Sequence, residues 1–151
     1  MNRPFQFRLE RLRALRERAE DSAKEDLAAS LSHRLKGEAL LRAAAEQVDG
    51  ARDAQRHSSG VTVSGAQLLA AQSYLERAER ARIAAAEDLH RRDADVEARR
   101  GALIEAARER QALERLKERR RADHAAEAGR AESVALDEMS LAVHRRRGVL
   151  S

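Results

Sequence analysis

The stretch HSSGVTVSGAQ, residues 57–67, decides the fold of this chain of 151 residues. Its first part, residues 57–60, combines histidine, serine and glycine, which is the chemistry of a turn. The β-branched run that follows, residues 61–63, is disfavoured inside helices. Because no comparably strong break occurs elsewhere, this stretch divides the chain into two long segments, and both have helical patterns.

A helix is expected to begin directly after this break. Ser64 and Gln67 have the spacing of a capping box, and Val63 with Leu68 has that of a hydrophobic staple. Together these signals predict an all-α fold. We expect one domain over 1–151, with a first helix over about 3–56, a loop over about 57–64 and a second helix over about 65–146.

The first helix has a seam of mostly apolar residues in steps of four and three. Pro4 stands where the first turn of a helix tolerates proline. Between residues 19 and 31 the seam takes three consecutive steps of four, which predicts a local unwinding of the supercoil. The members of the seam are Phe5, Leu9, Leu12, Arg16, Ala19, Ala23, Leu27, Leu31, Leu41, Ala45 and Val48.

The second helix keeps a strict seven-residue register over residues 68–120. The first column is Leu68, Leu75, Arg82, Leu89, Val96, Leu103, Arg110 and Lys117, and the second is Ala71, Ala78, Ala85, Arg92, Arg99, Ala106, Leu113 and Arg120. Small alanine side chains in one column let two helices approach closely. The two segments therefore predict an antiparallel two-helix coiled-coil hairpin.

The second segment is longer than the first, so part of it is expected to have no partner helix. With the loop centred near residue 60, Phe5 falls opposite the region of Arg115. Residues from Arg120 onward then form a C-terminal single-helix overhang. An isolated helix of that length is marginal in water unless a partner covers it. The overhang is therefore the expected partner-binding surface.

Composition argues against an ordinary globular domain. Charged residues make up 37% of the chain and aromatic residues only 2%, which is typical of long helices and coiled coils. There is no cysteine for a disulfide or a thiolate metal site. No apolar run is long enough for a signal peptide or a membrane span, so we expect a soluble, cytoplasmic protein.

The motifs of catalysis and cofactor binding are also missing from the sequence. No glycine-rich nucleotide loop is present. Glu87 and His90 form a single Glu-x-x-His, whereas a di-iron site in a helix bundle needs a second copy and further glutamates. A two-helix hairpin offers no pocket that excludes water. We expect no catalytic residue, no cofactor and no metal ion.

Binding to nucleic acid is an alternative, because the net charge is +4 and basic clusters occur at 117–121 and 145–147. Acidic residues dominate between the two clusters, and no aromatic residue stands beside the arginines to stack on bases. A basic coiled coil associated with nucleic acid is therefore kept as an alternative, and the main expectation is that no nucleic acid binds.

The chain resembles the flagellar export protein FliJ family over nearly its whole length. The residues that carry the resemblance are Phe5, Phe7, Leu9, Leu12 and Leu15 near the N-terminus, Tyr74-Leu75 early in the second helix, and Leu113, Leu116 to Arg119, Glu127, Arg130, Glu132 and Leu136-Asp137-Glu138 toward the C-terminus. One departure is His124, which stands where many relatives have an aromatic residue. A family contact made by a tyrosine on that face is not expected here.

The resemblance implies a non-enzymatic component of flagellar type III export that is similar to the central stalk subunit of rotary ATPases. Relatives bind the export ATPase hexamer, contact the cytoplasmic domain of the export gate and escort export chaperones. This implies a location at the inner face of the cell membrane, reached through partners only. The equivalent stalk of a virulence type III secretion system is a second alternative.

The hairpin alignment and the resemblance together indicate which residues bind partners. The basic residues at the end of the hairpin opposite the loop lie near one another in the alignment and are expected to face polar groups that line a ring of ATPase subunits, and the overhang is expected to dock other partners. The candidates are Arg8, Arg11, Arg13, Tyr74, Leu116, Lys117, Arg119, Arg120, Arg121, Glu127, Arg130, Glu132, Leu136, Asp137 and Glu138.

Overall fold

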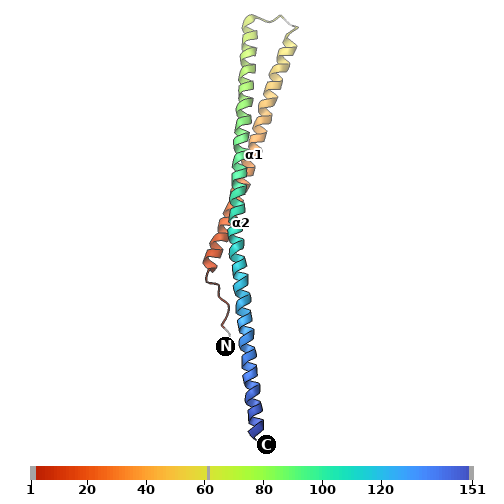
Figure 1. Cartoon of the computed structure of the whole chain (residues 1–151). Coiled ribbons are helices and arrows are strands. Elements are labelled where there is room, and N and C mark those ends of the chain that lie inside the picture. The colour runs from red at the N-terminus through yellow and green to blue at the C-terminus, as the bar shows by residue number, and fades with distance from the viewer. Residues whose placement is uncertain (1–2, 61, 150–151) are drawn as a thin grey trace. The chain divides into compact units, whose positions relative to one another are not determined.

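The computed structural model describes residues 3–60 and 62–149, so Val61 of the expected break lies outside the described residues. Two helices make up the fold: α1 spans Glu10–Ser58 and α2 spans Gly65–Val149 (Figure 1). The described residues contain no strand, and the predicted all-α fold is confirmed. Contacts divide the chain into two units. We call Glu20–Glu105 the hairpin unit, and Met1–Ala19 with Ala106–Ser151 the terminal unit.

The loop of the hairpin unit has the capping geometry that the sequence predicts. The backbone N–H of Ser64 donates to Oε1 of Gln67 at 3.0 Å, and the backbone N–H of Gln67 donates to Oγ of Ser64 at 3.2 Å. This reciprocal capping box satisfies two backbone donors that the helix itself cannot. At the end of α1 the hydroxyl of Ser58 donates to the carbonyl of Gln55 at 3.0 Å.

The buried positions of α1 in the hairpin unit follow a heptad, and the predicted run of steps of four agrees with it only in part, because Ala23, Leu27 and Leu31 are half-buried whereas Ala19 is exposed. Glu20 is buried at 7% exposure, whereas Ala19 is exposed. One row of buried and half-buried positions alternates steps of three and four through residues 20, 23, 27, 30, 34, 37, 41, 44, 48, 51, 55 and 58, and residues 31, 38 and 45 beside this row are half-buried as well. The register of α2 imposes this choice, because a heptad on one helix is matched only by a heptad on the other.

The predicted columns of α2 are largely confirmed within the hairpin unit. Val96 and Ala78 are 3% and 6% exposed. Leu68, Arg82 and Arg99 are exceptions, since all three are exposed. The two arginines keep their charge in water, and Leu68 lies in the first turn of α2. Small residues of α1 fill the facing column, so the two helix backbones come close together.

The pairing of the two helices differs from the expected one by one heptad. In the hairpin unit, Arg34 donates to Asp93 at 2.6 Å and Gln55 lies against Gln72. Each partner stands one heptad further along α2 than a loop centred near residue 60 predicts. α1 ends at Ser58 and α2 begins at Gly65, so the loop is centred beyond residue 60.

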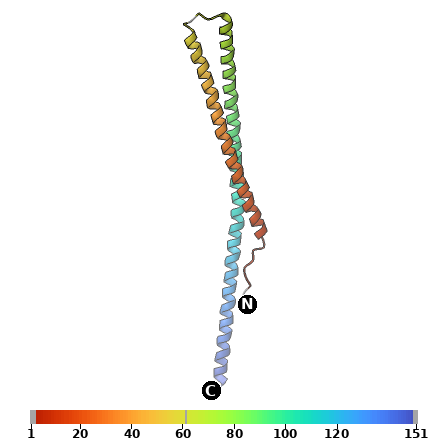
Figure 2. The same ribbon diagram turned by 180° about the vertical axis from the view of Figure 1, so that it is seen from behind.

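In the terminal unit the chain before α1 is not helical, so the expectation of a helix from about residue 3 is wrong. Phe5 and Phe7 are half-buried, whereas Gln6 and Arg8 are exposed. This alternation is the period of an extended chain, in which every second side chain lies on the same face. A helix would turn the two rings to nearly opposite sides. Figures 1 and 2 both show the N-terminal segment running beside α2.

The single-helix overhang is present but begins later than predicted. The N-terminal segment covers α2 as far as Glu127, so α2 is not free from Arg120 onward. From Gly129 to Val149 every residue of α2 is exposed. Among the described residues, neither helix contains a stretch that is long and apolar enough to cross a membrane.

Candidate partner-binding surface

An ion-pair cluster in the terminal unit joins the start of α1 to α2. The carboxylate of Glu10 accepts hydrogen bonds from Arg13 at 2.8 Å and from Lys117 at 2.9 Å. Arg13 also lies 3.2 Å from Glu17 and 3.9 Å from Glu114. The charges of Arg13 and Lys117 are therefore balanced within the chain. This leaves them less available to a partner than the sequence reading expected.

The other candidate basic residues of the terminal unit are turned toward solvent. Arg8, Arg11, Arg119 and Arg120 are all exposed. Arg121 is exposed too, but its guanidinium lies 5.7 Å from the centre of the Phe5 ring, which is the geometry of a cation–π contact. The structure thus brings the N-terminal and the α2 arginines to the same unit, as the hairpin alignment predicted.

The N-terminal segment packs against α2 through Phe5. Its ring centre lies 5.7 Å from that of His124, with the ring planes tilted by 59°. Arg8, Leu116 and Arg120 line the same shallow groove between the segment and α2. The ring of His124 therefore contacts a residue of its own chain. Sequence reasoning missed this contact, although the Phe-x-Phe alternation at residues 5–7 signals an extended segment.

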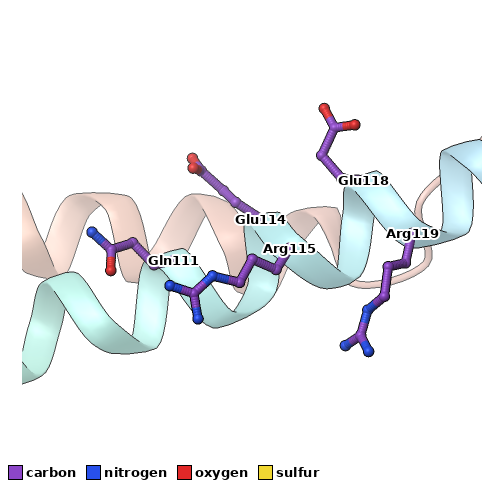
Figure 3. Close-up of a pocket in the computed structure, with 5 residues that line it drawn as sticks. All are labelled: Gln111, Glu114, Arg115, Glu118 and Arg119. Atoms are coloured by element: carbon purple, nitrogen blue, oxygen red, sulfur yellow. The ribbon is translucent and has the colours of Figure 1, made fainter.

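A second shallow groove lies along α2 itself. It is lined by Gln111, Glu114, Arg115, Glu118 and Arg119. Figure 3 shows Arg115 reaching back toward Gln111, while Glu114 and Glu118 extend away on the other side of the groove. Such an open strip of mixed charge suits contact with a polar protein surface better than the enclosure of a small molecule.

The remaining candidates lie on exposed parts of α2. Tyr74 belongs to the hairpin unit and is 49% exposed, whereas its neighbour Leu75 is half-buried in the seam. Leu116 is half-buried under the N-terminal segment. The candidates on the overhang and just before it are all exposed, namely Glu127, Arg130, Glu132, Leu136, Asp137 and Glu138. Which of these bind partners stays a prediction.

The described residues offer no cluster of three or more His, Asp or Glu side chains that could hold a metal ion. Every buried side-chain nitrogen or oxygen among them has a hydrogen-bond partner.

The two cations beside Glu10 lower the pKa of its carboxyl from 4.5 to about 2. The hydrogen bond from Arg13 is the largest cause, and the hydrogen bond from Lys117 is the second. A carboxyl whose pKa is lower in the folded state stabilises that state above its unfolded pKa. The ion-pair cluster therefore weakens as the pH falls from 4.5 toward 2.

We predict that Arg13→Gln raises the pKa of Glu10 toward 4.5, and that Lys117→Gln raises it by less. Carbon-detected NMR titration of the Glu10 carboxyl measures both values. Arg11→Gln is the control, because Arg11 is exposed and adjacent but is not one of the cations that lower the pKa of Glu10. A wild-type midpoint near 4.5 would contradict the cluster.

The comparison with protein families gives a match over nearly the whole chain. A family model described as flagellar FliJ protein matches residues 5–149 of the chain. No curated protein and no solved structure is significantly similar to the chain. The match includes the N-terminal segment, both helices and the whole of the described overhang.

Proposed function

Because the chain belongs to the flagellar FliJ family and is thus a component of flagellar type III export, we propose that it acts as a stalk in the ring of the export ATPase. The observation that supports this role is the group of exposed arginines in the terminal unit, which we call the arginine group: Arg8, Arg11, Arg119 and Arg120. Their charges are available to acidic or polar groups that line a ring.

Arginine is suited to such a contact because its planar guanidinium presents five donors and holds its charge at any physiological pH. Charges at the rim of an interface act mainly on the rate of association and make it sensitive to salt. The contact with the ring is therefore expected to weaken as ionic strength rises. We propose no catalytic activity for the chain, in keeping with a family of non-catalytic export components.

We further propose that the remaining exposed candidates serve the other partners of export. Tyr74 is an amphipathic side chain held outward by the seam, which suits it to anchor a partner such as the cytoplasmic domain of the export gate. The acidic part of the overhang is a helix surface on which an export chaperone can dock. The protein then works in the cytoplasm at the flagellar base and reaches the membrane through its partners.

The test measures ATP hydrolysis and ring assembly by the export ATPase of the same organism, with and without the protein. We expect the wild type to increase both. Replacing Arg119 and Arg120 by alanine together with Arg11 should weaken the apparent affinity at least tenfold, because several charged contacts are lost at once.

A matched control replaces exposed arginines elsewhere on α2. Arg77 and Arg80 lie in the hairpin unit, and changing both to alanine alters the net charge without touching the arginine group. This variant should behave as the wild type. If the wild type changes neither hydrolysis nor assembly, the stalk role is wrong. If both variants lose the effect on the export ATPase to the same extent, the arginine group does not make the contact with the ring.

A further inference from the structure

One face of the overhang forms an apolar stripe with a charge at each end. Leu136, Met139 and Val143 follow one another in steps of three and four, and each is more than half exposed. Ser140, His144 and Arg147 line the same shallow groove, so these side chains share one face of α2. One turn before Leu136 the same face carries Glu132. We call Glu132, Leu136, Met139, Val143 and Arg147 the overhang stripe.

The overhang stripe is complementary to itself when one copy is reversed. Two antiparallel helices that cross between residues 139 and 140 place Glu132 of each copy opposite Arg147 of the other. In the same register Leu136 meets Val143, and Met139 meets Ser140. Glu132 and Arg147 then face each other at both ends of the contact, Leu136 and Val143 face each other inside them, and Met139 faces Ser140 at the centre. We propose that a second copy of this chain docks antiparallel on the overhang stripe.

The charge distribution of the overhang supports this occupant. The part of α2 from residue 123 to 138 has an excess of acidic residues, whereas Arg145, Arg146 and Arg147 follow near its end. In the proposed register residues 132–134 of each copy lie beside residues 145–147 of the other, so that Glu132 stands at the basic end of its partner. A parallel pair would place like charges opposite each other, which is destabilising.

The other apolar pair of the overhang does not have this property. Val134 and Leu141 lie on a different face of the helix, and each is 56% exposed. A reversed copy that brings Val134 opposite Leu141 also brings Arg130 opposite Arg145. Only the overhang stripe therefore combines apolar contact with matched charges.

The size of the contact sets its strength. Residues 132–147 span about 24 Å of helix, which is small beside the area that stable complexes bury. The dimer is expected to be reversible, with a dissociation constant on the order of 10⁻⁴ M. Such a weak dimer protects the stripe when no other partner is bound and gives way when one binds.

The first experiment measures the mass of the full chain by sedimentation equilibrium over a wide concentration range. We expect the average mass to rise toward that of a dimer. Glu132→Arg and Arg147→Glu should each weaken the dimer about tenfold, because each variant puts like charges opposite each other at two places. The double variant restores opposite charges and should return to within about twofold of the wild type.

A second experiment tests the register. The chain has no cysteine, so a single engineered cysteine reports one position. Ser140→Cys lies at the crossing point and should form a disulfide-linked dimer under mild oxidation. Val134→Cys lies on the other face and is the matched control.

Three results would overturn the proposal. The first is a mass that stays monomeric up to about 1 mM, ten times the expected dissociation constant; this would leave the stripe to a different partner. The second is a double charge variant that is no stronger than the single ones. The third is equal cross-linking at the two cysteine positions. None of these measurements uses the export ATPase, so the outcome is independent of the stalk role.

Discussion

Replacing Val48 by aspartate should unfold the hairpin unit at temperatures where the wild type is folded. Val48 is 1% exposed and lies on the heptad of α1. An aspartate there places an unpaired carboxylate between two helices, which costs about 3 kcal/mol or more. A fold with so few large buried side chains has little stability in reserve. Circular dichroism during thermal and urea unfolding measures the loss.

Leu40→Asp is the control for this prediction. Leu40 stands four residues before the seam residue Ala44 and is 54% exposed. The change costs helix propensity, about 0.5 kcal/mol, but buries no charge. The difference between the two variants therefore measures burial alone. Equal melting temperatures for both variants would show that Val48 does not lie in a helix interface.

The break and the two helices could be predicted from sequence because their signals are local. Ser64 and Gln67 satisfy each other's backbone groups within a single turn, and no distant residue changes that choice. The seven-residue register of α2 can also be predicted from sequence, since it repeats over many turns. Both belong to the kind of information that a one-dimensional pattern contains.

The register of α1 could not be predicted in the same way, because its own composition is misleading. Ala19 is the more apolar residue, yet the polar Glu20 is the one that is buried. The heptad of α2 decides between them. The buried carboxylate of Glu20 is tolerated because the amino group of Lys24 lies 3.6 Å from it. Only the partner helix contains this information.

The N-terminal segment shows a second kind of ambiguity. Phe5, Leu9 and Leu12 have the spacing of a helix seam, while Phe5 and Phe7 have that of an extended chain. The structure takes the extended form, because His124 and the groove on α2 accept the ring of Phe5. For the candidate site, the sequence identified the basic residues but not that Glu10 balances two of them. The partners of the rest stay predictions.

Replacing Gly37 by leucine should destabilise the hairpin unit, whereas the same change at Gly50 should stabilise it slightly. A Cβ atom at Gly37 would lie 2.7 Å from Cδ and 3.2 Å from Nε of Arg92. The guanidinium of Arg92 crosses over this glycine and donates to the carbonyl of His33 at 2.7 Å. A larger side chain displaces it, and overpacking of this kind costs about 1–3 kcal/mol.

Gly50 has no atom within 4 Å of the position of an added Cβ, so only helix propensity changes there, by about 0.5–1 kcal/mol in favour of leucine. Urea unfolding of the two variants gives the comparison. A double-mutant cycle with Arg92→Ala tests the cause, because this variant lacks the side chain that leucine would displace. In that background Gly37→Leu should cost clearly less than in the wild type. If Gly37→Leu costs the same free energy of unfolding in both backgrounds, the side chain of Arg92 does not explain the glycine at position 37. The close approach of the two helix backbones must then be the reason.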